Sequence, residues 1–104
     1  MVARIVDKLA DIKAEGGKAL TLFLTAGFPE LHSTPELVLE LERAGADIIE
    51  LGMPFSDPLA DGPIIQHSSA IALKNGATLD TILSDVKKIR ASSNIPIVLM
   101  GYVN

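Results

Sequence analysis

The sequence predicts an α/β fold of the (β/α)8 barrel type, present as the first three βα units and an N-terminal helix. Short apolar runs at residues 18–28, 48–51 and 95–103 alternate with helical patterns. Such uniformly apolar strands are typical of parallel sheets. The first strand-to-helix turn lacks the Gly-x-Gly-x-x-Gly pattern of a dinucleotide-binding sheet, which favours the barrel. Three strands cannot close a barrel, so we expect residues 1–104 to form a single, incomplete domain.

The first helix and strand are predicted from the spacing of apolar residues. Residues 2–14 repeat apolar side chains at helical spacing among charged ones, and two glycines follow. We expect an amphipathic helix that lies on its own domain. In the strand that follows, Thr21, Phe23 and Thr25 share one face. That face is more polar than the opposite one, which is unusual for a simple core.

Capping and stop signals define the remaining helices. Ser33, with Glu36 three residues later, predicts a capping box, and Gly45 ends this helix just before the second strand. Pro63 begins another helical segment, and Thr78 is expected to cap the last helix. The apolar side chains of that last helix recur at helical spacing and are Leu79, Ile82, Leu83, Val86 and Ile89.

Composition argues against several classes of function. The net charge is -4 and the nine Lys and Arg residues are scattered, so no nucleic-acid partner is expected. There is no cysteine, and the two histidines lack metal-ligand spacing, so no metal is expected. No apolar run reaches the roughly 18 to 20 residues of a membrane-spanning helix. We expect a soluble, cytoplasmic protein without a membrane partner.

Two acidic residues are the strongest candidates for chemistry. Glu50 interrupts an apolar strand, where a carboxylate is costly to bury unless it is paired, hydrogen-bonded or used. If Ile49 and Leu51 face the helices, Glu50 points into the barrel, where a buried acid suits proton exchange. The alternative is a structural Glu bonded to backbone or to a lysine. Asp61 precedes Gly-Pro, and a turn or helix-capping role explains it equally well.

Residues 50–64, with the sequence ELGMPFSDPLADGPI, resemble the signature of the tryptophan synthase alpha chain family. Residues 23–29 and 95–102 support this resemblance, which covers the whole chain. It implies a TIM barrel that acts in L-tryptophan biosynthesis. The implied reaction is carbon-carbon lyase chemistry, the retro-aldol cleavage of indole-3-glycerol phosphate to indole and glyceraldehyde 3-phosphate, without a cofactor.

The resemblance also implies roles for individual residues. Glu50 would shuttle protons to indole C3 and from the glycerol hydroxyl, and Asp61 would hold the indole N–H and stabilise the positive charge. The implied substrate-binding residues are Phe23, Thr25, Met100 and Tyr102. The implied partner is the beta chain, in a heterotetramer of two alpha and two beta chains. Its contacts would be Met53, Pro54, Phe55, Asp57 and Pro58.

The length differs from that of a complete barrel, which takes about 250 residues and commonly builds its phosphate site after strands 7 and 8. With 104 residues, the chain is expected to be a truncated form with little or no activity alone. Its last strand would leave an apolar edge. Two alternatives stay open: a non-catalytic half-barrel that binds a beta chain or self-associates, and another phosphate-handling (β/α)8 enzyme.

Overall fold

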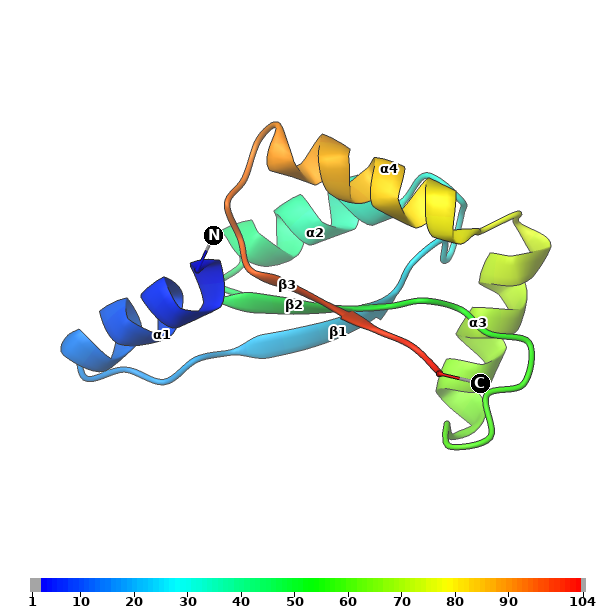
Figure 1. The fold of residues 1–104 in the computed structure, drawn as a ribbon, viewed down its shortest axis with the longest axis horizontal. Helices are drawn as coiled ribbons and strands as arrows, with labels where there is room; N and C mark the ends of the chain where they lie inside the picture. The colour runs from blue at the N-terminus through cyan, green and yellow to red at the C-terminus, as the bar shows by residue number, and fades with distance from the viewer. Residues whose placement is uncertain (1–2, 104) are drawn as a thin grey trace.

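A computed structural model of the chain describes residues 3–103 (Figure 1). The helices and strands occur in the predicted order. Their order is α1 (Arg4–Ala14), β1 (Thr21–Thr25), α2 (Thr34–Arg43), β2 (Ile48–Gly52), α3 (Pro63–Lys74), α4 (Leu79–Arg90) and β3 (Ile97–Met100). Within residues 3–103, no helix has the length and apolar character needed to cross a membrane.

The strands form one parallel sheet in the order β1-β2-β3. Phe23 is in register with Glu50, and Glu50 with Val98. Because neighbours in register point to the same side of a sheet, these side chains share one face. The same face ends, at the carboxyl side of the sheet, in a row made of Thr25, Gly52 and Met100.

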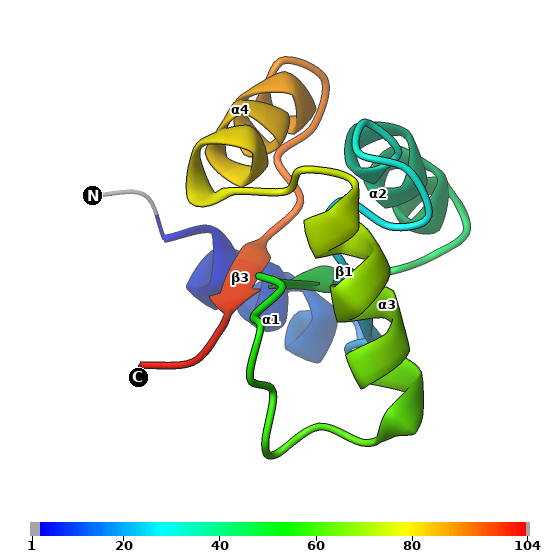
Figure 2. The same ribbon diagram turned by 90° about the vertical axis from the view of Figure 1, so that its right-hand side faces the viewer.

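Helices α2 and α4 cover the opposite face, as the two views in Figures 1 and 2 show. Ile49 and Leu51 are fully buried there and pack in one apolar cluster with Val38 of α2 and Ile82 of α4. This burial is the main source of stability, at roughly 25 cal/mol per Å² of apolar surface removed from water. The predicted orientation of β2, with Glu50 facing away from the helices, is therefore confirmed.

The beginning of α2 differs from the prediction. Ser33 makes no side-chain capping bond, because its backbone is already helical, with φ -73° and ψ -25°. Its hydroxyl accepts a hydrogen bond from the Glu30 N–H at 3.2 Å instead. Thr34, fully buried, accepts from the Gly27 N–H at 3.0 Å and fastens the turn after β1. The predicted Thr78 cap on α4 is confirmed.

Helix α1 lies at the amino-terminal end of the sheet (Figure 1), and none of its described residues is buried. The prediction that it lies on the domain is borne out only in part: Ile5 lies near Pro96 and Ile97, but Ile5 and Leu9 remain 38% and 43% exposed. The helix is linked to the sheet through Lys8, whose ammonium lies 3.7 Å from the Asp47 carboxylate. That carboxylate also accepts a hydrogen bond from the Leu20 N–H at 2.8 Å.

Candidate active site

A cavity of about 260 Å³ opens at the carboxyl end of the sheet, between the strand ends, the loop of residues 53–62 and α3. Figure 2 is viewed from this end of the molecule. Barrels of parallel strands place their active sites at this end. The lining contains aromatic, apolar and hydroxyl side chains and one carboxylate: Phe23, Thr25, Gly52, Met53, Ala60, Asp61, Ile65, Ser69, Met100, Gly101 and Tyr102.

The structure brings together all but one of the residues predicted to bind or convert substrate. Those that line the cavity are Phe23, Thr25, Asp61, Met100 and Tyr102. Glu50 lies on the same sheet face, in register with Phe23, but does not line the cavity. It is half-buried rather than buried, because α2 and α4 pack on the opposite face of the sheet.

Two glycines allow side chains from neighbouring segments to enter the cavity. A Cβ atom at Gly52 would lie 2.5 Å from Cζ of Phe23, and one at Gly101 would lie 2.6 Å from Cε of Met53. Carbon atoms at optimal contact are about 3.5 to 4.0 Å apart, so any larger residue would displace the ring or the thioether. Glycine at a strand end is a general signal for such a close approach.

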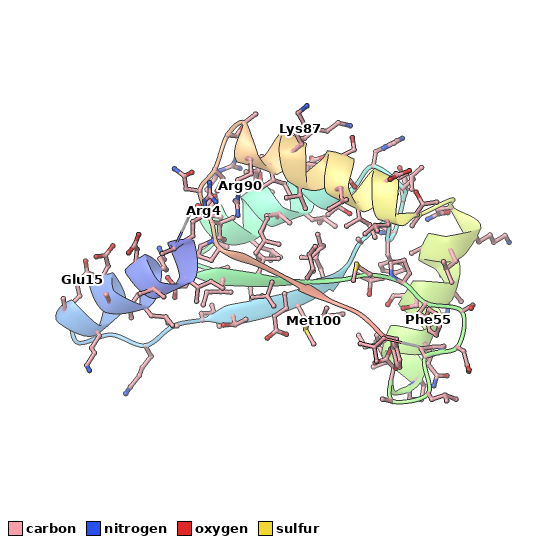
Figure 3. All side chains as sticks on the ribbon, in the orientation of Figure 1. Arg4, Glu15, Phe55, Lys87, Arg90 and Met100 are labelled. Carbon is pink, nitrogen blue, oxygen red and sulfur yellow. The ribbon has the colours of Figure 1, made fainter. Side chains whose placement is uncertain are left out.

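Tyr102 fastens the loop after β2 to the segment after β3. Its hydroxyl accepts a hydrogen bond from the Ala60 N–H at 3.0 Å. Its ring stacks on Phe55, with ring centroids 5.3 Å apart and 17° between the planes. Figure 3 shows Phe55 on the loop, and Met100 projecting from β3 on the side away from α2 and α4. The sequence predicts none of these loop contacts.

The predicted partner surface is only partly exposed. Asp57 is exposed, whereas Phe55 is half-buried because its ring packs on Tyr102. The other half-buried residues of this set are Met53, Pro54 and Pro58. Leu59 and Ile64, at the edge of the same loop, are far more exposed, at 77% and 82%. The most accessible apolar surface near the loop is therefore formed by residues outside the predicted set.

Asp61 is held through its backbone. Its N–H donates to the Pro58 carbonyl at 3.1 Å. Its carbonyl accepts a hydrogen bond from the side-chain amide of Gln66 at 2.8 Å. Asp61 is half-buried and lines the cavity, so a residue that fits a turn also contributes to the cavity wall. The sequence analysis did not identify Gln66, and its place in the first turn of α3 is the pattern that points to it.

A buried pair of hydroxyls joins β1 to α3. Oγ1 of Thr25 lies 2.7 Å from Oγ of Ser68. The Ser68 hydroxyl also donates to the Ile65 carbonyl at 3.0 Å. A hydroxyl carries one proton, so Thr25 must be the donor to Ser68, and its own oxygen keeps free acceptor capacity. The sequence does not predict Ser68 as a partner of this site.

Two ionisable groups perturbed by burial lie outside the cavity. Burial raises the pKa of Asp85 on α4, while the nearby Lys88 and His32 act in the opposite direction. Burial lowers the pKa of the Arg90 guanidinium, which donates to the Ile95 carbonyl at 2.7 Å. Neither side chain lines this cavity.

The parallel sheet, its helical layer and the cavity at its carboxyl end define part of a (β/α)8 barrel protein. Sequence comparison then gives the family: the model described as "Tryptophan synthase alpha chain" matches residues 9–104. The chain belongs to the tryptophan synthase alpha chain family.

Similar proteins agree with this assignment. The chain is 58% identical over 103 residues to the tryptophan synthase alpha chain of Citrifermentans bemidjiense, covering 99% of this chain and 39% of that one. It resembles tryptophan synthase subunit alpha from Legionella pneumophila at 39% identity and a TM-score of 0.96, covering 100% and 40% of the two chains. A tryptophan synthase complex from Pyrococcus furiosus matches 83% of this chain and 35% of its own at 50% identity, with a TM-score of 0.77.

Proposed function

We propose that this chain supplies the N-terminal part of the active site that cleaves indole-3-glycerol phosphate to indole and glyceraldehyde 3-phosphate. The observation that carries the proposal is Asp61 at a cavity with Phe23 and Tyr102 in its walls. Aromatic walls suit the flat indole ring, and a carboxylate beside them suits its N–H. Because the chain spans 39% of the C. bemidjiense relative, the activity is proposed for the whole protein.

In this reaction indole C3 gains a proton and the bond from C3 to the glycerol carbon breaks. The hydroxyl on that carbon loses its proton and becomes the aldehyde. Protonation places positive charge on the indole nitrogen, which the Asp61 carboxylate stabilises through a charge-assisted hydrogen bond. Glu50, on the same sheet face as Phe23, exchanges the protons.

The remaining contacts with substrate divide between this chain and the rest of the barrel. Phe23, Thr25, Met100 and Tyr102 contact the indole half in this proposal. None of the described residues that line the cavity is Lys or Arg. In this proposal the phosphate is bound by residues that relatives have beyond the matched segment, where barrels commonly place this site.

A chimera tests the proposal, with residues 1–104 replacing the matching segment of the C. bemidjiense chain. The chimera should release indole from indole-3-glycerol phosphate, and the Asp61→Asn variant should lose about 10²- to 10³-fold in kcat. Glu36→Gln, which alters an exposed acid on α2, is the matched control and should keep the parent rate. A folded chimera without activity, or an Asp61→Asn variant at the parent rate, contradicts the proposal.

The partner in this proposal is a cytoplasmic beta chain, bound through the loop around Asp57 as part of a heterotetramer of two alpha and two beta chains. The similarity to a tryptophan synthase complex supports it, as does the exposure of Asp57. Asp57→Lys in the chimera should weaken beta-chain binding at least tenfold in titration calorimetry, because a rim charge of the wrong sign is costly. Unchanged affinity would remove this residue from the interface.

A second candidate function is a non-catalytic half-barrel that self-associates. The specific observation in its favour is edge strand β3, where Leu99 and Met100 are 41% and 43% exposed. Open apolar edges pair readily with other strands. Sedimentation of the 104-residue chain tests this candidate. Self-association supports it, and a monomeric chain contradicts it.

A further inference from the structure

The side chain of Gln66, on α3, forms a hydrogen bond with the backbone of Asp61. Nε2 of Gln66 donates to the Asp61 carbonyl at 2.8 Å and lies 3.4 Å from the Pro58 carbonyl. The Asp61 N–H donates to that same Pro58 carbonyl at 3.1 Å. One amide group on a helix therefore closes a small ring of hydrogen bonds around Asp61.

Apart from the bond from the Ala60 N–H to the Tyr102 hydroxyl, the loop has few other means of fixing this position. Prolines at 58 and 63 provide no N–H donors. The N-cap residue of α3, Gly62, has no side chain that could bind the free helix N–H groups. With both its N–H and its carbonyl bonded, the Asp61 backbone is held beside the cavity that this residue lines.

We propose that Gln66 is a positioning residue that acts through Asp61. It holds the carboxylate where the indole N–H arrives and does not itself touch the substrate. Catalytic geometry is sensitive to such support, since a displacement of about 1 Å can reduce a rate about 10²-fold. This inference rests on the proposed function, while the hydrogen-bond ring stands independently of it.

Gln66→Met keeps the length of the side chain and removes the donor. In the chimera described above, kcat should fall about tenfold while KM stays within about twofold. The decisive step is to repeat the substitution in the Asp61→Asn background. If Gln66 acts only through the Asp61 carboxylate, Gln66→Met should change kcat by less than about twofold in that background. A structural role elsewhere would lower kcat by the same factor in both backgrounds.

Gln66→Glu is the second variant, because an ionised carboxylate of the same shape can only accept hydrogen bonds. It should reproduce the loss seen with Gln66→Met. His67→Met is the matched control: His67 is the next residue on α3, is exposed, and makes no side-chain hydrogen bond to the residues that the structure describes. It should keep the parent kcat.

Amide hydrogen exchange on the 104-residue chain tests the ring without any catalysis. Gln66→Met should speed exchange of the Asp61 N–H about fivefold relative to the parent, and His67→Met should leave it unchanged. An inactive parent chimera would count against the proposed function alone. An active chimera whose kcat is insensitive to Gln66→Met, or unchanged Asp61 exchange, overturns the positioning role.

Discussion

The Tyr102 hydroxyl accepts a hydrogen bond from the Ala60 N–H at 3.0 Å and joins segments that are 42 residues apart in the sequence. Ala60 directly precedes Asp61, and Tyr102 lies two residues beyond the end of β3. The loop that carries the candidate carboxylate is therefore fixed on one side by β3 and on the other by α3. Tyr102 lines the cavity, whereas Gln66, the anchor on α3, does not.

Tyr102→Phe should loosen this loop while keeping the ring stacked on Phe55. The Ala60 N–H would lose its protein acceptor, and water can replace it in part. We expect the free energy of unfolding of the 104-residue chain to fall by about 0.5 to 1 kcal/mol. Urea denaturation should show a lower midpoint with an unchanged slope. An unchanged midpoint would show that the bond adds nothing to folding.

Gly52→Ala should disturb the cavity wall, because the added Cβ would meet Cζ of Phe23 at 2.5 Å. Overpacking costs about 1 to 3 kcal/mol in a core, and we expect a value of about 1 kcal/mol because the Phe23 ring is 38% exposed and can shift. Gly17→Ala is the control, since its Cβ would meet its nearest neighbour, Cγ2 of Ile12, at an ordinary 3.6 Å. Thermal unfolding should separate the two variants. Equal melting temperatures would mean that Phe23 moves aside without loss.

Asp85→Asn should stabilise the chain at neutral pH. Asp85 is 3% exposed, and burial raises its pKa in the folded state, against smaller opposite effects of Lys88 and His32. A raised folded-state pKa means that stability is full below the ordinary value of 3.8 and is lost as pH rises through the folded-state pKa. The neutral amide avoids that loss.

The melting temperature of Asp85→Asn should therefore exceed that of the parent at pH 7, and the difference should shrink as the pH falls toward 3.8. Asp80→Asn is the control, because Asp80 is exposed in the first turn of α4. It should be neutral or slightly destabilising, since an acid favours a helix N-terminus. A pH-independent gain for Asp85→Asn would mean that ionisation is not its cause.

Leu99→Lys should reduce self-association of the 104-residue chain. Leu99 is 41% exposed on edge strand β3, and a lysine on an edge opposes strand pairing between molecules. Sedimentation equilibrium of parent and variant would measure the change. Leu83→Lys, at an exposed position on α4, is the control for added charge. If both variants associate equally, β3 is not the contact.

Much of this fold could be predicted because its signals are local. Apolar runs and helical spacing predicted every element, and the Thr78 cap needed only its own neighbours. The gathering of Asp61 and Tyr102 could also be predicted, since parallel strands bring their carboxyl ends to one edge. The orientation of β2 followed from the alternation of Glu50 with Ile49 and Leu51.

The features that could not be predicted depend on backbone angles and on contacts distant in sequence. Ser33 failed as a cap because its helical φ and ψ could not be read from its residue type. The Thr25 hydroxyl pairs with Ser68 across 43 residues, and no periodicity encodes such a bond. The half-burial of Glu50 depends on what covers its sheet face, which a strand pattern alone does not specify.

Indole release by the chimera with Glu50→Gln tests the central claim most directly, because the amide keeps the shape of Glu50 and cannot exchange a proton. We predict a loss of about 10²- to 10⁴-fold in kcat, with an unchanged melting temperature and with Glu36→Gln at the parent rate. A Glu50→Gln chimera that releases indole at the parent rate would contradict the assignment of this strand acid to the reaction.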